Sequence, residues 1–213
     1  RFLAIAEFGP RAILYHEGAR YRINRAILPL DETAEGDGLP TGSAKLCQKC
    51  GYLHPIAVGE GADLCERCHA SLGAPLRQLF WLQNVSTKRA DRINCDEEER
   101  LRMGYELKTG VRFPDREGRR SCRSAEILVG DTSLATMTYG HAATLWRLNL
   151  GWRRRANKEQ RGFLLDLERG YWGRNEQDKE EDPDDPMSAR TKRVIPYVED
   201  RRNCLLLEPS DEL

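Results

Sequence analysis

The chain has 213 residues, a length that suits one large domain or two small ones. Lys and Arg together number 34, as do Asp and Glu, so the zero net charge excludes a global electrostatic argument for nucleic acid and leaves only local ones. No apolar run approaches the ~18 residues that span a bilayer, and no signal peptide is visible. We therefore expect a protein of the reducing cytoplasm that has no membrane partner.

The first predicted element is a β-hairpin at residues 11–30. Apolar and polar residues partly alternate on both sides of Gly18, where a tight turn can use a positive φ, and Pro29 ends the second strand. Residues 31–44 are rich in Asp, Glu, Gly, Thr and Ser, a composition typical of a loop. This loop leads into the part of the chain with the clearest chemical signal.

Four cysteines follow in two tight pairs, Cys47 with Cys50 and Cys65 with Cys68, and fourteen residues separate the pairs. Each pair places two sulfur atoms at the tip of a tight turn, and two such turns form the closed tetrahedral shell that structural zinc prefers. Gly51 lets the backbone curl back toward the metal after the first pair. We therefore expect the four cysteines to bind one structural Zn²⁺ ion, with free thiols or a disulfide as the alternative.

Two histidines and three further cysteines lie outside this pattern. His54 and His69 are close enough in sequence to replace a thiolate, although four thiolates already complete the shell. Cys95, Cys122 and Cys204 show no pairing pattern, and such cysteines are more often small buried residues than reactive ones. The segment around the cysteine pairs has too few apolar residues to fold alone, so we expect metal binding to contribute much of its folding free energy.

The segment after the cysteines has the pattern of strand, basic loop, helix and strand. Residues 78–85 form an apolar run of strand length, and 87–92 indicate a basic loop. Asn94 can cap a short helix whose first turn holds Asp96–Glu99, where carboxylates suit the helix dipole. The acidic run could instead bind a hard cation, but its residues are consecutive rather than spaced for coordination. Tyr105–Phe113 has the pattern of another strand.

Short strand candidates separated by glycines fill the remainder of the chain. The candidates are Ser124–Val129, Leu134–Tyr139, Ala142–Leu150, Gly162–Glu168, Arg193–Val198 and Asn203–Leu207. Gly130 and Gly140 mark breaks, and Glu176–Asp185 indicates a mobile acidic loop. About ten short strands with few short helices predict a mainly β fold, a small β-barrel or sandwich with an inserted four-cysteine module similar to a zinc ribbon.

We expect three parts in this chain. Residues 1–30 and 76–122 form a small barrel-like part, 31–75 the zinc module, and 123–213 a β-rich part with an acidic loop at 176–186. The chain begins without Met and ends in a segment that reads like a strand, so we expect it to be a piece of a larger polypeptide.

No constellation of catalytic residues is visible in the sequence. It contains no Gly-x-x-x-x-Gly-Lys-Ser/Thr phosphate loop, no Gly-x-Ser-x-Gly elbow and no His-Glu-x-x-His helix. The four histidines do not suggest a nucleophilic triad. We expect no catalytic residues in this chain, and a hydrolase that uses Asp or Glu carboxylates is a weaker alternative.

The local argument for nucleic acid rests on stretches that combine basic and aromatic residues. Guanidinium groups neutralise phosphates, and aromatic rings stack on bases. The candidate nucleic-acid-binding residues are Trp146, Arg147, Trp152, Arg153, Arg154, Arg155, Lys88 and Arg89. Another basic cluster contains Arg116, Arg119, Arg120 and Arg123. The alternative interpretation is solvated strand edges, where basic residues discourage sheet aggregation.

Several segments, taken together in their order, carry a resemblance to a known family. They are Gly9–Tyr21, the four cysteines, Leu82–Thr87, Asp96–Tyr105, Leu145–Trp152 and Arg202–Leu207, and they cover nearly the whole chain. The chain resembles the accessory region that follows the motor in large DEAD/DEAH-box helicases. These include the MrfA-like DNA-repair helicases and the helicase subunit of the DISARM phage-defence system.

In that family two RecA-like motor domains hydrolyse ATP and translocate on nucleic acid. The resemblance implies a non-catalytic accessory domain whose four cysteines bind zinc, with ATP and Mg²⁺ bound only by the motor of the parent protein. It implies DNA, single-stranded or duplex, and the motor domains of the same polypeptide as partners. The alternative is a protein-interaction module that docks a partner subunit without touching nucleic acid, which the zero net charge favours.

Overall fold

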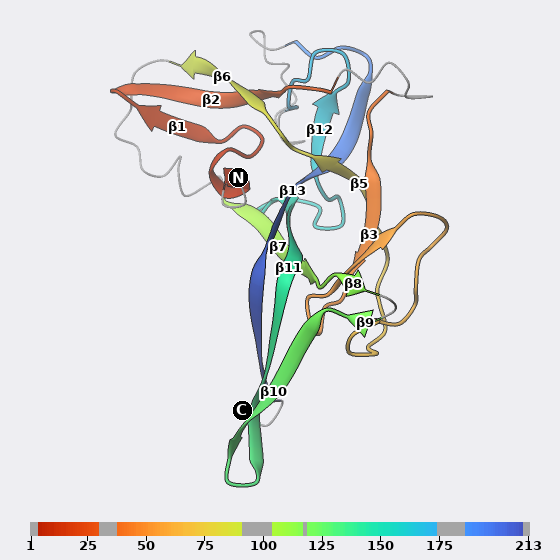
Figure 1. The fold of residues 1–213 in the computed structure, drawn as a ribbon. Helices are drawn as coiled ribbons and strands as arrows, with labels where there is room; N and C mark the ends of the chain where they lie inside the picture. Colours follow the sequence, from red (N-terminus) through yellow and green to blue (C-terminus); the bar gives the residue numbers. More distant parts are fainter. Residues whose placement is uncertain (1–3, 30–37, 91–103, 117–118, 174–185, 211–213) are drawn as a thin grey trace.

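The computed structural model describes residues 4–29, 38–90, 104–116, 119–173 and 186–210. Within these ranges the chain is built from strands and one single-turn helix (Figure 1). The elements are α1 (Ala4–Glu7), β1 (Ile13–His16), β2 (Ala19–Ala26), β3 (Gly42–Leu46), β4 (Leu53–Ile56), β5 (Leu76–Trp81), β6 (Val85–Ala90), β7 (Tyr105–Arg112), β8 (Asp115–Arg116), β9 (Arg119–Arg120), β10 (Cys122–Val129), β11 (Thr132–Trp152), β12 (Phe163–Asp166) and β13 (Thr191–Pro209). The described part of the chain contains no helix of the length and apolar character that crossing a bilayer requires.

The strands form a small sheet, a large sheet and a two-stranded ribbon. The small sheet has the order β1-β2-β6, and the ribbon pairs β8 with β9. The large sheet has the order β10-β11-β13-β5-β3-β4, with β12 beside β13 and β7 beside β11. It curls into a half-barrel, so the predicted mainly β fold with a four-cysteine module is confirmed.

The predicted N-terminal hairpin is the pair β1 and β2. The two strands are antiparallel, with Ile13 opposite Arg22 and His16 opposite Ala19. Glu17 and Gly18 form the turn with φ of 46° and 71°, the positive values that a two-residue type I′ connection requires.

The predicted strand at 78–85 and the basic loop at 87–92 are both corrected by the structure. β5 ends at Trp81, and β6 begins at Val85 and joins the other sheet. The basic residues up to Arg89 therefore lie in a strand, because β6 finds an antiparallel partner in β2. The apolar run is continuous in sequence but serves two sheets.

Two long strands replace four predicted short ones. β11 joins the candidates 134–139 and 142–150, and β13 joins 193–198 and 203–207. Gly140 is not a break: the register of β11 against β13 shifts between Gly140 and Ala143, which is a β-bulge. A Cβ at Gly140 would collide with the Phe113 ring, so the glycine permits close packing rather than ending a strand.

Some predictions lie outside the described residues. They are the helix that Asn94 would begin, the acidic run Asp96–Glu99, Cys95, and the acidic loop Glu176–Asp185. The division into three parts stays a prediction. The large sheet draws strands from the segments 31–75, 76–122 and 123–213 alike.

Three hydrophobic clusters fill the interior. The first packs the aromatic side chains Tyr105, Trp152, Phe163 and Trp172 against residues of the small sheet. The second packs leucines of β3, β4, β5 and β11 together. The third surrounds the cysteines and includes Val111 and Phe113 after them in the chain. The cysteine module is therefore continuous with the core of the large sheet.

Candidate metal centre

The four predicted cysteines converge on one point of the molecule. The Sγ atoms of Cys47 and Cys68 are 3.5 Å apart, those of Cys50 and Cys65 are 3.6 Å apart, and all four lie within 4.8 Å of one another. A disulfide requires about 2.05 Å between its sulfur atoms, so the four are free thiols. Zinc–sulfur bonds of ~2.3 Å in a tetrahedron give sulfur–sulfur edges of ~3.8 Å. The four cysteines are thus arranged to hold a metal ion, and the arrangement fits structural zinc.

Each cysteine pair forms the same tight turn, which we call a knuckle: Cys47–Gly51 and Cys65–His69. The N–H of Gly51 donates to the carbonyl of Cys47, and the N–H of His69 donates to the carbonyl of Cys65, both at 3.0 Å. The fifth residue of each knuckle has a positive φ, 69° at Gly51 and 57° at His69. The predicted role of Gly51 in curling the chain is confirmed, and His69 occupies the equivalent position in the second knuckle.

Neither histidine belongs to the group of candidate ligands found among the described residues, which is made of the four cysteines alone. His54 is buried on β4, with its ring edge-to-face on Tyr52 and its Nδ1 3.5 Å from the carboxylate of Glu66. Burial lowers the pKa of His54, so the ring is neutral near pH 7. His54 therefore packs inside the zinc module, and His69 provides the positive φ that closes the second turn.

Burial and hydrogen bonds set the protonation of the thiols. Burial raises the pKa of Cys50 and of Cys65. At Cys68 burial acts in the same direction, but the Ala70 N–H and the neighbouring thiols outweigh it and lower the pKa to about 7. The N–H of Arg67 points at the sulfur of Cys65 from 3.4 Å. A divalent cation supplies the positive charge that buried thiolates need, so metal binding releases protons from this site.

The first knuckle is attached to the large sheet through its backbone. The N–H of Val111 on β7 donates to the carbonyl of Gly51 at 3.0 Å, and Tyr52 forms a parallel bridge with Val111. The hydroxyl of Tyr52 also lies 3.5 Å from the carbonyl of Phe113. β7 thus extends its hydrogen bonding directly onto the metal turn.

The second knuckle is attached through the two side chains between its cysteines. Glu66 forms an ion pair with Arg112 of β7, with Oε2 3.0 Å from Nη1. Arg67 makes a two-pronged ion pair with Glu208 of β13 and donates to the Thr138 hydroxyl of β11 at 3.3 Å. The Arg67 side chain is only 12% exposed. Adjacent residues of opposite charge therefore bind three strands of the large sheet, Glu66 one and Arg67 two.

The loop between the knuckles is held by a buried lysine. Lys45 of β3 donates from Nζ to the carbonyl of Ala62 at 2.9 Å and lies 3.4 Å from the Asp63 carboxylate. Sequence reasoning missed Lys45, Glu66 and Arg67. The only available signal was the position of Glu66 and Arg67 inside a metal turn, and it does not identify their partners.

Two of the predicted nucleic-acid residues are interior residues. Trp152 stacks on Tyr105 with ring centres 4.9 Å apart and meets Phe163 edge-to-face, so it packs in the core and its ring is not available to a base. Arg155 pairs with Glu106 at 2.8 Å and donates to the carbonyl of Trp152. These two predictions are corrected, because the stretch around residue 152 turns inward at the end of β11.

Trp146 and Arg147 lie half-buried in the middle of the large sheet. Trp146 donates from Nε1 to the Glu199 carboxylate at 3.0 Å and packs against the second hydrophobic cluster. At these positions β11 is paired with β7 on one side and β13 on the other. The basic and aromatic stretch of the sequence is therefore mostly the interior of a sheet.

The remaining predicted residues, Lys88, Arg89, Arg153 and Arg154, are exposed. Lys88 and Arg89 lie on β6, and the backbone N–H of Arg153 donates to Gly104 at 2.7 Å, one residue before β7. Arg120 and Arg123 of the other basic cluster are exposed on β9 and β10. The structure thus distributes the predicted basic residues over several strands.

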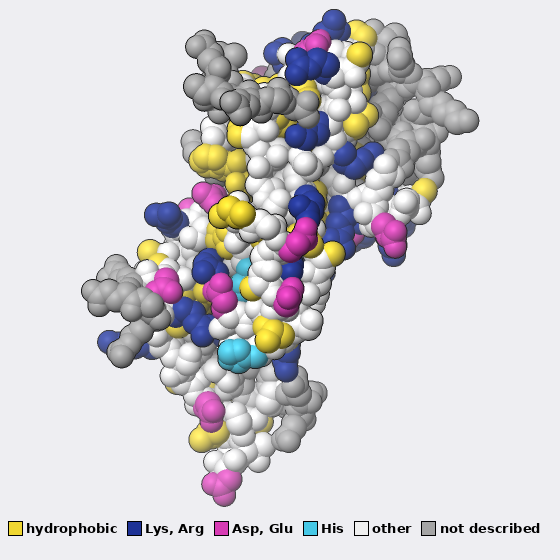
Figure 2. Space-filling view, turned by 90° about the vertical axis from the view of Figure 1, so that its right-hand side faces the viewer, with side chains coloured by type: hydrophobic (Ala, Val, Ile, Leu, Met, Phe, Trp, Pro, Cys, Tyr) yellow, Lys and Arg dark blue, Asp and Glu magenta, His cyan; other side chains and the backbone are white. Residues whose placement is uncertain are grey.

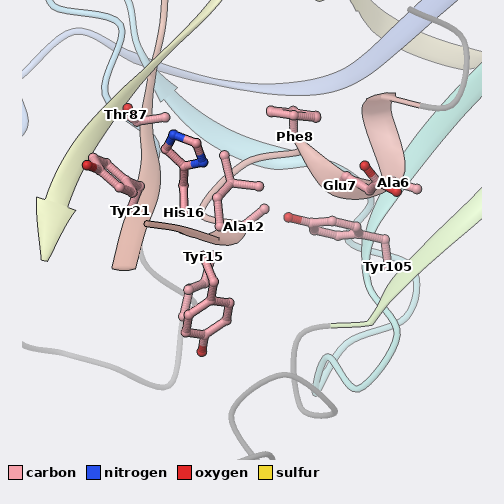
Figure 3. A pocket seen from close by; sticks show the side chains of 11 residues that line it. Ala6, Glu7, Phe8, Ala12, Tyr15, His16, Tyr21, Thr87 and Tyr105 are labelled. Atoms are coloured by element: carbon pink, nitrogen blue, oxygen red, sulfur yellow. The ribbon is translucent and has the colours of Figure 1, made fainter. Parts of the chain in front are cut away.

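A pocket of about 850 Å³ lies beside the small sheet (Figure 3). The side chains that give it aromatic character are Phe8, Tyr15, His16, Tyr21 and Tyr105. His16 and Phe8 point to one side of β1, and Tyr15 points to the other (Figure 3). Arg89 is directly opposite Tyr21 across the β2–β6 pair, so the two side chains leave the same face of the sheet. No local sequence pattern indicates this pocket, because its walls come from α1, β1, β2, β6 and β7.

Compared with protein-family models, with curated proteins and with solved structures, the chain matches none.

Proposed function

We propose that the chain is a zinc-binding accessory domain of an ATP-dependent DEAD/DEAH-box helicase. The observation that supports a structural metal is the convergence of four thiols whose Sγ atoms lie within 4.8 Å of one another. A shell of four thiolates is closed and leaves no position for a substrate, so the metal braces the fold and takes no part in turnover. The helicase context rests on the sequence resemblance.

In this proposal the accessory domain contributes no catalytic group. ATP and Mg²⁺ bind only to the motor domains of the parent polypeptide, and the accessory domain contacts those motor domains and the DNA. The parent protein acts in DNA repair or in phage defence. Cys47, Cys50, Cys65 and Cys68 bind Zn²⁺ and fix the knuckles on β7, β11 and β13.

The pocket beside the small sheet is the place where we propose that nucleic acid binds. Aromatic walls offer stacking surfaces to unpaired bases, and each stacked base contributes about 1–3 kcal/mol. Arg89 leaves the sheet on the same face as Tyr21, and the backbone N–H of Arg153 donates to Gly104, the residue before Tyr105. Two exposed arginines are therefore close to residues that line the pocket. Single-stranded DNA suits this arrangement better than duplex, because only unpaired bases expose their faces.

A protein-interaction module is the second candidate, and two observations favour it. Cationic and anionic side chains are interleaved over the face seen in Figure 2, so this face lacks the continuous basic stripe that typically tracks a phosphate backbone. Leu205 and Leu207 are also exposed on β13. In this candidate the basic residues contribute to solubility and docking, and nucleic acid is not bound.

The zinc part of the proposal is tested by elemental analysis of the purified chain. We expect one zinc ion per chain and none after Cys47→Ser combined with Cys50→Ser. A chain without bound metal, or a double variant that keeps its full metal content, would contradict the ligand set.

The nucleic-acid part is tested by fluorescence anisotropy with a labelled single-stranded oligonucleotide over a range of salt concentrations. We expect Tyr21→Ala to weaken binding about 5- to 150-fold, the loss of one stacked base. Arg89→Ala should weaken binding and flatten the salt dependence by about one unit of slope. Arg77→Ala is the matched control, because Arg77 is an exposed arginine paired with Glu60 in the zinc module. If Arg89→Ala has the same dependence of affinity on salt concentration as Arg77→Ala and Tyr21→Ala, only the protein-interaction candidate is left.

A further inference from the structure

Three strands extend together beyond the rest of the molecule. We call residues 122–129, 132–140 and 203–209 the projection; it is drawn at the bottom of Figure 1. Its strands are in register across the sheet: Arg123, Tyr139 and Leu205 form one row. The next rows are Ala125, Met137 and Leu207, then Ile127, Ala135 and Pro209.

The two faces of the projection differ in what covers them. Residues opposite each other in a sheet share a face, so the three rows above define one face, which we call the outer face. The inner face carries Cys204 and Leu206, which pack against the cysteine cluster, and Glu208, which binds Arg67. The metal module therefore covers the inner face.

The outer face is apolar and exposed. Leu205 and Leu207 are 60% and 57% exposed, and Ile127 and Tyr139 are 39% exposed each. Strands covered on both faces have continuous apolar sequences, whereas strands covered on one face alternate with polar residues. The apolar run from Cys204 to Leu207 is continuous, which is the pattern of a strand covered on both faces. The described part of the chain covers only its inner face.

Charge is arranged asymmetrically along this face. From Ala125 to the tip, the rows of the outer face contain no charged residue, and Asp131 lies in the exposed tip turn. At the base, Arg123 is exposed in the first row, and Arg201 alternates onto the same face of β13. The face thus has an acidic end and a basic end about 27 Å apart, the length of eight residues in a strand.

We infer that the outer face is the contact surface for a second copy of this chain. A symmetric dimer requires a surface that complements itself. A two-fold axis perpendicular to the strands places the tip of one projection over the base of the other, so Asp131 of each copy meets Arg123 and Arg201 of its partner copy. Between these charged ends the leucines interdigitate, with the two sheets ~10 Å apart.

The position of the projection leaves room for this packing. β10 ends the strand order of the large sheet, and among the described residues β13 from Glu199 to Pro209 pairs with β11 only. The outer face is therefore bordered by two open strand edges, which a face-to-face partner also shields. This inference does not depend on the proposed helicase context or on nucleic acid.

Sedimentation velocity of the zinc-loaded chain over a concentration series tests the inference. We expect a dimer whose Kd lies below ~100 μM, and we expect Leu205→Lys combined with Leu207→Lys to weaken it at least ~10-fold, because the variant would bury unpaired charge. Val58→Lys is the matched control, since Val58 is 90% exposed on the loop between the knuckles. A chain that stays monomeric at ~100 μM, or a double variant that dimerises as well as the control, would overturn the inference.

A charge exchange separates this dimer from other modes of association. Asp131→Arg should weaken the dimer because it places like charges together at each end, and adding Arg123→Asp should restore part of the lost affinity, because Arg201 keeps its charge. The secondary structure of every variant is checked by circular dichroism. Failure of the second substitution to restore a dimer weakened by the first would overturn the proposed orientation of the two copies.

Discussion

The two knuckles share one backbone design but are attached to the sheet by different means. The first knuckle is bound through main-chain contacts of Gly51 and Tyr52 with β7. The second knuckle is bound through the side chains of Glu66 and Arg67. A main-chain contact tolerates most substitutions, whereas a side-chain ion pair depends on one residue at each end. The comparison teaches that the second knuckle carries the sequence-specific link between the metal and the long strands.

Removing either cysteine pair should have the largest effect on the stability of the two knuckles. Cys47→Ser with Cys50→Ser, and Cys65→Ser with Cys68→Ser, should each abolish binding of the metal, which contributes on the order of 10 kcal/mol in small zinc modules. Hydrogen exchange should then distinguish the two variants. Amides at 62–72 should lose protection in both, while Val111 should keep more protection when the first knuckle is intact. Full protection of 62–72 in either metal-free variant would contradict a stabilising role for the metal.

Glu208→Gln should be the next largest effect. It leaves the nearly buried Arg67 guanidinium without its carboxylate, and we expect a loss of about 2–3 kcal/mol in the free energy of unfolding. Glu66→Gln should cost less than about 1 kcal/mol, because Glu66 is half-exposed and its pair is screened by water. Denaturant unfolding of the zinc-loaded protein measures both, with the exposed Glu60→Gln as the control. Equal losses for Glu66 and Glu208 would show that the two pairs do not differ as described.

The smallest expected effect concerns the fifth residue of each knuckle. Gly51→Ala should lower the free energy of unfolding by about 1 kcal/mol, because φ of 69° is unfavourable for a residue with a Cβ. A steric clash adds nothing to this loss, because the nearest atom to the new Cβ would be the Thr109 carbonyl oxygen at 3.9 Å. His69→Gly removes the conformational cost of the positive φ but adds entropy to the unfolded chain. The two effects nearly cancel, so the free energy of unfolding should change little. Thermal unfolding of both variants measures the difference. A larger loss at His69 would indicate that its ring has a role beyond the backbone.

Local patterns in the sequence were sufficient for the metal centre. The spacing of the cysteines, the glycine after the first pair and the turn at Gly18 all act within a few residues, and the structure has each of them where it was expected. Turn geometry depends on such short segments, so sequence reasoning reaches it directly.

Contacts between distant segments account for the errors. Arg67 and Glu208 are 141 residues apart, and nothing near either residue identifies the other as its partner. Trp152 and Arg155 have the composition of a nucleic-acid surface, but Tyr105 and Glu106 of β7 hold them in the fold. Gly140 has the pattern of a break, yet Phe113 makes it a site of close packing. In each case the deciding partner belongs to another strand.

The length of β11 has a mechanical consequence. A single strand of 21 residues runs from the tip turn to the aromatic cluster, about 70 Å of continuous backbone apart from the effect of its register shifts. It is hydrogen-bonded to β10 and then β7 along one side and to β13 along the other. A force along this strand loads many ladder hydrogen bonds in shear at once rather than opening them one at a time. The strand therefore resists extension along its axis, and the hydrogen bond from Arg67 to Thr138 connects the second knuckle to it.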